Sequence, residues 1–420
     1  MTPESPARGS RIPVPTIKKL DLREYKRSDP EELSVKERDA LSEFLTLEPA
    51  IGEDSKYHLT PSSTVGALEV GDLSVSIQPK LPVARVLYLA SHAIGAIGFR
   101  EELFGYKDEP TLIEALVPVF AAAARRAFSR GLLHGYRTEE DALQTVRGRI
   151  RLDEQIRRRF GVPVPVEVRY DDYTVDVLPN RLIKAAALRL LGLRLHQGSR
   201  VKLADVLANL EEVQTVAFSP GNLPKVRFDR LNEHYREVVE LSRLILRHTS
   251  IEPLRGNVRA SGFLVDMNVV FQEFVTQALR RALRLSEHTF PTDKDLPERI
   301  WLDEANRVRL KPDLTWWVGE KCIFVGDAKY KKVDDKCVPN ADLYQLLAYT
   351  TALDLPGGLL IYAKGEDKEI NHRVRHASKQ IEVATLDLSG SIKQLDLRVQ
   401  QLAKRVRELS QNAVADRLAA

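Results

Sequence analysis

The order of secondary-structure elements after about residue 260 is the feature that most constrains the fold. Apolar residues recur at helical spacing over 263–285 and form one continuous face. The patterns that follow come in a fixed order, with strands near 299–303, 307–318 and 321–330, a helix at about 341–353, and strands at Gly358–Tyr362 and Ile381–Leu388. A helix, three strands, a second helix and further strands predict a mixed sheet flanked by helices.

Three charged side chains are predicted to meet in the hairpin of this unit. Asp327 and Lys329 are two residues apart in a strand, so their side chains share a face. A turn at Gly319-Glu320 pairs that strand with the one before it and brings Asp313 within one residue of lying opposite Asp327. Three apolar residues lead directly into Asp327, which places the charges at the end of a buried strand. We predict a catalytic site of Asp313, Asp327 and Lys329; the alternative is an Asp–Lys pair on a surface hairpin.

Two neighbouring carboxylates repel each other unless a cation lies between them. Mg²⁺, or Mn²⁺ in its place, prefers oxygen ligands, and the predicted ligands are Asp313, Asp327 and the main-chain carbonyl of Ala328. Such an ion polarises a phosphodiester and lowers the pKa of a bound water. Lys329 would orient the attacking water or neutralise charge in the transition state. The predicted reaction is metal-dependent hydrolysis of a phosphodiester bond.

Pro312-Asp313 followed by Asp327-x-Lys329 resembles the signature of the PD-(D/E)xK nucleases. The order of helices and strands also resembles their restriction-endonuclease-like fold. This resemblance implies an endonuclease whose substrate is double-stranded DNA. Lys331 and Lys332 come directly after the signature, and we predict that they contact DNA, because basic side chains neutralise phosphates.

The same resemblance indicates two further kinds of site residue. Gln345 and Tyr349 lie one turn apart on the helix after the hairpin, and they resemble the Gln-x-x-x-Tyr of the RecB-like branch, in which the Gln helps to fix the site. Simple packing of the tyrosine is the alternative. These nucleases usually carry another acid on the helix before the hairpin, where this chain has Gln272. We name Glu273 as its substitute, although it projects about 100° away around the helix.

The resemblance extends beyond the nuclease unit to most of residues 65–365. Its short motifs lie at Leu73–Pro82, Arg147–Ile150, Tyr170–Thr174 with Asp176, Asn180-Arg181 with Lys184, and Asp266–Asn268. Taken together they are similar to the McrC family, the nuclease subunits of the McrBC restriction systems that act on modified cytosine. That similarity implies a partner, an AAA+ GTPase ring of the McrB kind, which recognises methylated DNA and translocates.

The resemblance also implies that the N-terminal domain engages the ring and stimulates its hydrolysis of GTP. The sequence contains no Gly-x-x-x-x-Gly-Lys-Ser/Thr loop, so we expect GTP to be used by the partner and not by this chain. Four polar residues, Asp172, Asp176, Asn180 and Lys184, either contact the partner or cap and brace a helix that starts near Asn180.

We predict an α+β protein of several domains. They are a flexible leader at 1–11, a β-rich partner-binding domain at 12–110, a helical middle region at 111–255, a restriction-endonuclease-like α/β core at 256–390 and a C-terminal helix at 391–420. Within the β-rich domain, Leu73, Val75 and Ile77 alternate with polar residues, as in a half-buried strand. The C-terminal helix carries a heptad seam. It either docks on the nuclease domain of the same chain or pairs with a second copy, which would bring two sites together for double-strand cutting.

Composition bears mainly on the compartment. The sequence has only two cysteines, and it lacks both the apolar segment of a secretory signal and any run of about 18 apolar residues. We therefore predict a cytoplasmic protein that does not cross a membrane. The net charge is only +4, from 63 basic and 59 acidic residues, so local clusters decide more than the total. Six arginines crowd residues 147–159, where they either neutralise phosphates or form a solvated helix face with interleaved acids.

Two other functions fit the sequence. A nuclease fold with a decayed site, kept for binding DNA or the ring, would account for Gln272, whereas the intact Asp313, Asp327 and Lys329 favour catalysis. A nuclease of another defence or repair system would work with a different motor. A neighbouring gene for a GTPase with a modified-base reader would distinguish this last possibility from the McrC resemblance.

Overall fold

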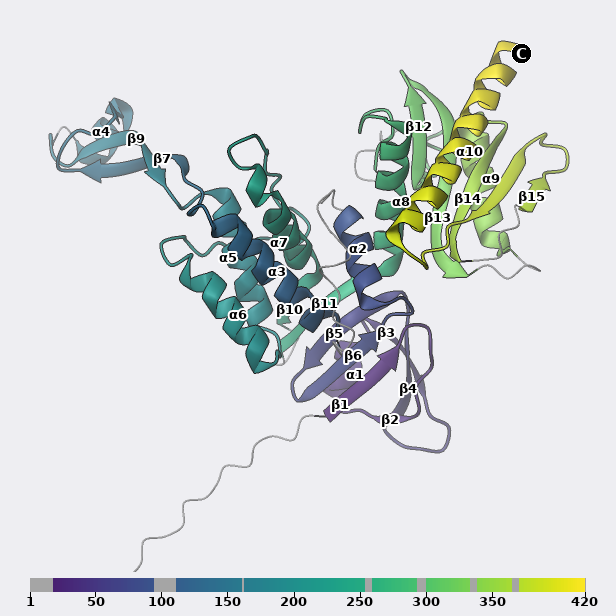
Figure 1. The fold of residues 1–420 in the computed structure, drawn as a ribbon, viewed down its shortest axis with the longest axis horizontal. Coiled ribbons are helices and arrows are strands. Elements are labelled where there is room, and N and C mark those ends of the chain that lie inside the picture. Colours follow the sequence, from purple (N-terminus) through teal and green to yellow (C-terminus); the bar gives the residue numbers. More distant parts are fainter. Residues whose placement is uncertain are drawn as a thin grey trace, which may run out of the picture.

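The structure is a computed structural model that describes residues 18–93, 111–160, 162–253, 259–292, 300–332, 338–364 and 370–419. The leader predicted at 1–11 lies outside these ranges. Helices and several separate sheets alternate along the chain, which confirms the predicted α+β class. Figure 1 shows a β-rich part at the bottom, a helical part and a projecting arm at the left, and a second α/β part at the right. None of the helices in the described ranges is long and apolar enough to cross a membrane.

A five-stranded sheet forms the centre of the β-rich part. Its order is β1 (Lys18–Arg23), β6 (Leu73–Gln78), β5 (Thr64–Val70), β11 (Arg259–Asp266) and β10 (Thr249–Pro253). A smaller sheet of β2 (Glu31–Glu32), β4 (Lys56–Pro61) and β3 (Leu45–Pro49) packs beside it with α1 (Val35–Leu41). The alternation predicted for β6 is confirmed, because Leu73, Val75 and Ile77 are buried while the residues between them are partly exposed.

Two strands of this sheet come from residues far along the chain. β11 pairs antiparallel with β5, with Gly66 opposite Leu264. Gly66 has φ +130°, and a Cβ there would lie 2.0 Å from the Phe263 carbonyl oxygen, so only glycine permits this pairing. The domain boundary predicted at residue 255 therefore runs through the sheet. Local periodicity could not show this, since the pairing joins segments about 200 residues apart.

The helical middle region holds α3 (Leu112–Phe128), α5 (Leu178–Leu191), α6 (Gln197–Ala208) and α7 (Arg236–His248) around one apolar core. Of the four polar residues discussed above, Asp176, Asn180 and Lys184 lie in or just before α5, whereas Asp172 lies on β9 (Val166–Thr174) and pairs with Arg147. Asn180 is buried and donates to the Leu133 and Val175 carbonyls, and Asp176 accepts from Arg137 and Arg181. These bonds hold the start of α5 in place, which agrees with the bracing interpretation.

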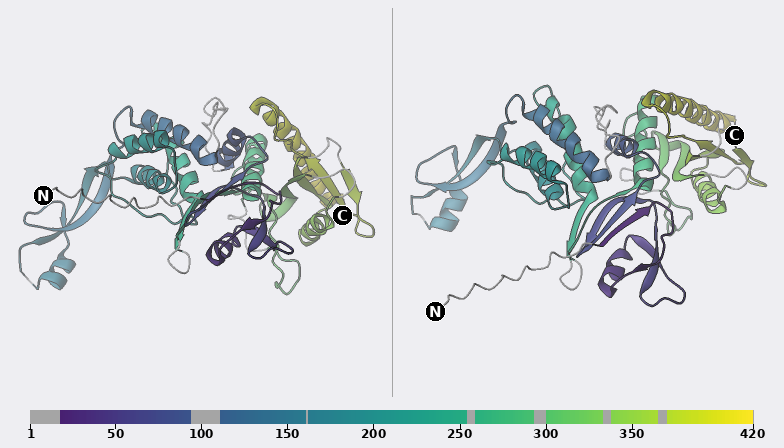
Figure 2. Two further views of the ribbon diagram at one scale, coloured as in Figure 1. Left: turned by 90° about the horizontal axis from the view of Figure 1, so that it is seen from below. Right: turned by 60° about the horizontal axis from the view of Figure 1, so that its bottom comes forward.

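An arm projects from this region (Figures 1 and 2). It consists of β7 (Gly135–Leu143), β8 (Arg149–Ile150), α4 (Leu152–Arg159) and β9 (Val166–Thr174), and it lies within the range predicted as a helical middle region. Its arginines are interleaved with acids, since Arg157 and Arg158 both pair with Glu154. Apolar side chains on the arm stay exposed, including Ile156 at 68% and Phe160 at 90%.

The C-terminal part is a three-layer unit. Its mixed sheet has the order β12 (Leu314–Val318), β13 (Lys321–Lys332), β14 (Gly357–Lys364), β16 (Gln380–Thr385) and β15 (Ile370–Arg373). α8 (Met267–Leu283) and α10 (Ile392–Ala419) contact each other and β13, and α9 (Asn340–Ala352) packs on β13, β14 and β16 from the opposite face. Of the strands predicted at 299–303 and 307–318, only 314–318 is a regular strand; before it the described residues form one isolated bridge, Trp301 to Arg309, and residue 299 lies outside the described ranges.

The predicted heptad seam of α10 is buried within the same chain. Leu395, Val399, Leu402 and Val406 join the core that also contains residues of α8 and β13. Docking on the chain's own α/β unit therefore accounts for this seam.

Helix α2 (Val83–Ala93) connects the β-rich part to α8. His92 lies in this contact, with its ring 4.1 Å from that of Tyr88 and 6.1 Å from that of Phe274. Burial, with a smaller contribution from the charge of Arg281, lowers the pKa of His92 to about 4. The imidazole is thus neutral at the junction between the two parts.

Acidification is expected to destabilise the protein through His92. Because its folded-state pKa of about 4 lies below its ordinary value of 6.5, the unfolded chain binds the proton more readily. The free energy of unfolding therefore falls as the pH drops below about 6.5 and continues to fall to about pH 4, with a loss of roughly 2 kcal/mol between pH 7 and pH 5. Denaturant unfolding of the wild type and of His92→Leu at both pH values measures this loss. An equal loss in the variant would contradict the assignment.

Candidate active site

The hairpin of β12 and β13 brings Asp313 and Asp327 together. Leu314 pairs with Gly326 across the two strands, so Asp313, one residue earlier, lies opposite Asp327. The Ala328 N–H donates to Asp313 Oδ2 at 2.9 Å and fixes this carboxylate against the partner strand. Asp327 is only 1% exposed. The register agrees with the one expected from the turn at Gly319-Glu320.

Lys329 lies on the same face of β13 as Asp327. Its Nζ is 2.6 Å from Asp327 Oδ2 and donates to Gln345 Oε1 at 3.0 Å. This face of the strand is covered by α9, whereas Tyr330 on the opposite face packs near Phe271 of α8. The ammonium is therefore held between a strand carboxylate and a helix amide.

Gln345 and Tyr349 close this network. Gln345 Nε2 donates to Tyr349 Oη at 2.7 Å, and the Tyr349 hydroxyl donates to the Lys311 carbonyl at 2.9 Å. Lys311 is two residues before Asp313, so a continuous chain of contacts leads from Asp327 through Lys329 and α9 back to the start of β12. The ring of Tyr349 is buried and packs in the core, and its hydroxyl also makes both of these hydrogen bonds.

The electrostatics of the three charged groups are strongly coupled. Burial raises the pKa of Asp313 well above its usual range, and the adjacent charge of Asp327 raises it further. Burial also raises the pKa of Asp327, although Lys329 opposes this. Burial alone would lower the pKa of Lys329, but the charge and hydrogen bond of Asp327, together with the charges of Asp313 and Asp342, outweigh it and the net pKa is raised. Two carboxylates and one ammonium thus leave the site short of positive charge.

These residues fit a hard divalent cation. Asp327 Oδ1 is buried and accepts no hydrogen bond from any residue that the structure describes. A cation next to both carboxylates would allow both to ionise. Among the described residues, no group of three or more acidic, histidine or cysteine side chains could hold a metal ion. The side chains at this point therefore supply two metal ligands, Asp313 and Asp327. Ala328, between Asp327 and Lys329, is the residue whose carbonyl we expect to add to them.

Gln272, at the place where a further acid was expected, and Glu273, named as its substitute, lie on α8. Both oxygens of Glu273 accept from Arg247 of α7, at 2.5 and 2.8 Å. Phe271 and Phe274 occupy the buried face of α8, and Glu273 therefore projects around the helix toward the middle region. Glu273 thus forms an ion pair between α7 and α8, and this pairing argues against the catalytic role predicted for it.

A residue missed by the sequence analysis lies beside the site. Asp342, in the first turn of α9, pairs with Lys331 and is close enough that its charge adds to the effect of burial in raising the pKa of Asp327. It precedes Gln345 by three residues on one helix face, a spacing that could have indicated it. Of the two lysines predicted to contact DNA, Lys331 forms an ion pair with Asp342. The side chain of Lys332 lies outside the described residues.

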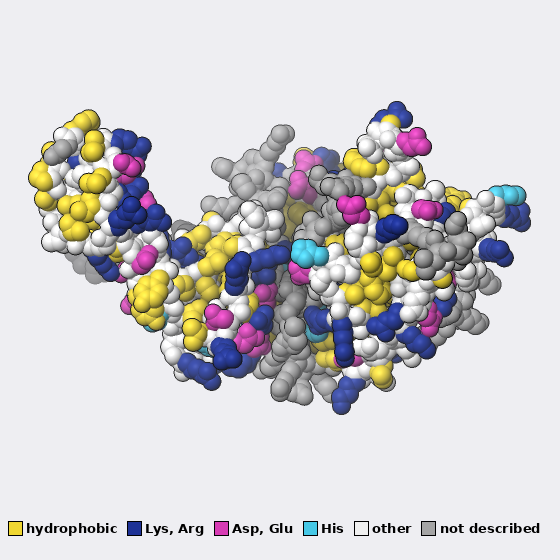
Figure 3. All heavy atoms as spheres, turned by 90° about the horizontal axis from the view of Figure 1, so that it is seen from above, with side chains coloured by type: hydrophobic (Ala, Val, Ile, Leu, Met, Phe, Trp, Pro, Cys, Tyr) yellow, Lys and Arg dark blue, Asp and Glu magenta, His cyan; other side chains and the backbone are white. Residues whose placement is uncertain are grey.

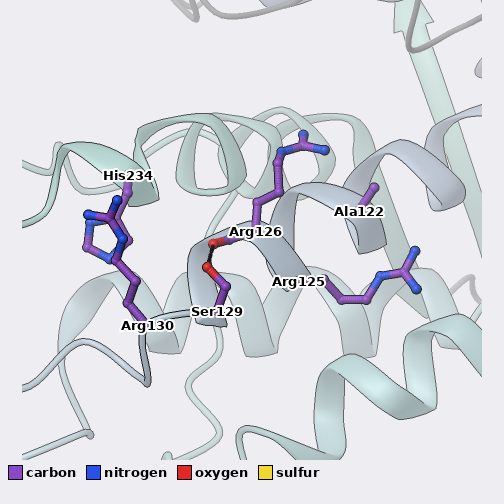
Figure 4. A pocket seen from close by; sticks show the side chains of 6 residues that line it. All are labelled: Ala122, Arg125, Arg126, Ser129, Arg130 and His234. Carbon is purple, nitrogen blue, oxygen red and sulfur yellow. Dashed lines mark hydrogen bonds between the residues drawn. The ribbon is translucent and has the colours of Figure 1, made fainter.

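An open depression of about 590 Å³ lies elsewhere, at the C-terminal end of α3. It is lined by Ala122, Arg125, Arg126, Ser129, Arg130 and His234 (Figure 4). Arg126 pairs with Glu237, and the Ser129 hydroxyl donates to the Arg126 carbonyl. Figure 4 shows Arg125 and Arg130 pointing to opposite sides. Because the guanidinium groups do not converge on one point, we assign no site to this depression.

Comparison with known proteins places the chain in a family. The profile described as "McrBC 5-methylcytosine restriction system component" matches residues 59–363. A chain in the refined half-complex from the tetradecameric assembly of Thermococcus gammatolerans McrB AAA+ hexamers with bound McrC is similar in fold, with a TM-score of 0.53 and 18% identity. That match covers 93% of this chain and 100% of the other. A chain of the Thermococcus gammatolerans McrBC complex matches at 20% identity and a TM-score of 0.42, over 63% of this chain and 88% of that one.

No curated protein matches the chain. The family profile spans well over half of the 420 residues and includes the hairpin, Gln345 and Tyr349. The chain therefore belongs to the family of McrBC 5-methylcytosine restriction system components.

Proposed function

We propose that this chain is the DNA endonuclease subunit of a modification-dependent restriction complex. The observation that carries the proposal is the buried Asp327, which has Asp313 opposite it and Lys329 Nζ 2.6 Å from its Oδ2. A structural ion pair would not need a second, partly buried carboxylate at the same point. The order α8, β12, β13, α9, β14 further supports a restriction-endonuclease-like core.

In this proposal Asp313 and Asp327 hold Mg²⁺ or Mn²⁺, together with the carbonyl of Ala328. A bound ion of this kind polarises the phosphodiester and makes a water nucleophile available near neutral pH. Lys329, held by Gln345, neutralises charge that develops on the phosphate and orients the water. Tyr349 keeps Gln345 in place through its bond to the Lys311 carbonyl. The network prepares the ammonium before the substrate binds.

We also propose an AAA+ GTPase ring as the partner. The similar structure described above contains McrB AAA+ hexamers with bound McrC. By analogy, this chain would stimulate GTP hydrolysis by such a ring and cut DNA that the ring delivers. The arm offers a surface for the contact: Figure 3 shows hydrophobic side chains gathered on it at the left of the view, and exposed apolar groups of this kind mark interaction sites.

The test is cleavage of plasmid DNA by the chain together with the AAA+ protein encoded beside it. With Mg²⁺ and GTP, methylated plasmid should be cut and unmethylated plasmid should stay intact. Binding of DNA or ring without any cleavage would instead identify a non-catalytic module. Cleavage that depends on a different motor would place the nuclease in another defence or repair system.

Lys329→Ala should abolish cleavage and leave metal binding intact. The ammonium acts on water and phosphate, whereas the ion is held by Asp313 and Asp327. Calorimetric titration with Mn²⁺ or Ca²⁺ measures the second property separately from activity. If Lys329→Ala lost metal binding while Asp327→Ala kept it, the roles assigned to these residues would have to be reversed.

A further inference from the structure

Strand β13 carries a second lysine beyond the proposed catalytic one. Lys331 follows Lys329 by two residues, in a stretch where the pairing of β13 with β14 is irregular, and its ion pair with Asp342 of α9 places it on the face of the strand that α9 covers. Its Nζ is 2.7 Å from Asp342 Oδ2. The lysine side chain keeps 41% of its surface exposed, whereas the Asp342 side chain is 9% exposed. A buried carboxylate thus holds an ammonium that solvent, and therefore a ligand, can reach.

The same oxygen of Asp342 has a second partner. The Tyr362 hydroxyl of β14 donates to Asp342 Oδ2 at 2.5 Å, and both residues are buried. This bond fixes the carboxylate on the sheet, so its position does not depend on the lysine. The carboxylate in turn restricts a flexible side chain that would otherwise lose its rotamer freedom only when a ligand binds.

The position of Lys331 indicates what it would bind. If the phosphate to be cut lies at Asp313, Asp327 and Lys329, a cation two residues further along the same strand faces the next anionic group of the substrate. In a nucleic acid, that group is the neighbouring phosphate of the same strand. Lysine is suited to such a contact, because it acts as a point charge that neutralises a phosphate.

We propose that Asp342 is a positioning residue, which holds the Lys331 ammonium for the phosphate next to the scissile one. This inference rests on the proposed nuclease function and adds a phosphate-binding position to it. Asp342 itself does not touch the reacting atoms; it acts through Lys331. The rival explanation is that Asp342 only braces α9 against β14 through Tyr362.

Two substitutions separate these explanations because each removes one partner of Asp342 Oδ2. Asp342→Asn removes the charge that holds Lys331 but keeps an oxygen that can accept from Tyr362. Tyr362→Phe removes the brace and keeps the Lys331–Asp342 pair. If Lys331 is what matters, Asp342→Asn should lower kcat/KM about tenfold, by the loss of one charge-assisted contact, and Tyr362→Phe should stay within about twofold of the wild type.

Lys331→Met and the double variant Lys331→Met/Asp342→Asn complete the cycle. Lys331→Met should weaken DNA binding and reduce the slope of log Kd against log salt by about one, whereas Asp342→Asn should leave that slope unchanged because the cation remains. Since Asp342 acts through Lys331, the double variant should be no worse than Lys331→Met alone.

Wild-type cleavage in the same assay tests the proposed function independently. If the wild type does not cut, the nuclease proposal fails. If the wild type cuts but the loss in the double variant equals the product of the losses in the two single variants, then Asp342 does not act through Lys331. Impairment of Tyr362→Phe equal to that of Asp342→Asn, with matching losses of thermal stability, would assign Asp342 to the brace. Either of these outcomes overturns the inference.

Discussion

Asp327→Asn is expected to reduce metal-dependent DNA cleavage on the order of a thousandfold or more, while the protein stays folded. The substitution keeps the shape of the side chain, removes the negative charge and replaces one carboxylate oxygen by an amide nitrogen, which cannot bind a cation. It also takes away the charge partner 2.6 Å from Lys329 Nζ. Two functions of the site, holding the ion and placing the ammonium, are lost together.

Stability should move in the opposite direction from activity. Burial raises the pKa of Asp327, so the folded protein holds a proton there more tightly than the unfolded chain does. Ionisation near neutral pH therefore costs stability when no metal is bound, and a neutral amide removes that cost. The melting temperature of metal-free Asp327→Asn should not fall below that of the wild type. Glu320→Gln, the same chemical change at an exposed turn of the same hairpin, is the control and should cut normally. Cleavage by Asp327→Asn at the wild-type rate would remove Asp327 from the catalytic site.

The hairpin could be predicted because all of its determinants are close together in the sequence. A turn at Gly319, with φ +59°, sets the register of two short strands, and this register places Asp313 opposite Asp327. Gln345 and Tyr349 were also accessible, since one helical turn separates them and their contacts reach only the neighbouring strands. Short-range geometry thus accounts for the hairpin, whereas the resemblance to the RecB-like nucleases was what identified Gln345 and Tyr349 as site residues.

The contacts that the sequence could not show join distant segments. Glu273 was named as an acid of the site, but Arg247, 26 residues earlier on another helix, binds its carboxylate. Asp342 was overlooked because its partner Tyr362 lies on a strand whose register against α9 depends on the whole sheet. Likewise, β11 belongs to the sheet of the first 80 residues although it immediately precedes α8. Periodicity identifies elements, but it contains no information on which distant elements pair.

The pairing of β11 with β5 determines how the ring-binding role and the nuclease role must be assigned to separate parts of the chain. A chain cut near residue 255 would lose β11, the strand that pairs with β5, and would leave the apolar core of that sheet incomplete. Failure of such a fragment to bind the ring would say nothing about where the ring contact lies. Surface substitutions in the full-length chain avoid this problem, because they leave the sheet and α8 intact.

The arm is where we expect the largest effect on the partner. Ile156 and Phe160 are 68% and 90% exposed, on and just after α4, and neither contributes to the buried cores of the described residues. The double variant Ile156→Ser/Phe160→Ser should fold like the wild type, because it removes apolar surface from water and not from a core. If the arm contacts the ring, the variant should lose stimulation of GTP hydrolysis, and cleavage of methylated plasmid should be lost with it.

Three chains compared in one steady-state GTPase assay make the result interpretable. Asp327→Asn should stimulate the ring as the wild type does and cut nothing, which would separate the two activities. Leu188→Ser, an exposed apolar residue on α5 away from the arm, should stimulate and cut normally and so controls for loss of an apolar surface group. The arm variant should do neither, because without the ring contact no DNA is delivered to Asp313, Asp327 and Lys329. Full stimulation by the arm variant would move the ring contact to another surface, whereas loss of stimulation in Asp327→Asn would mean that the nuclease site itself affects the ring.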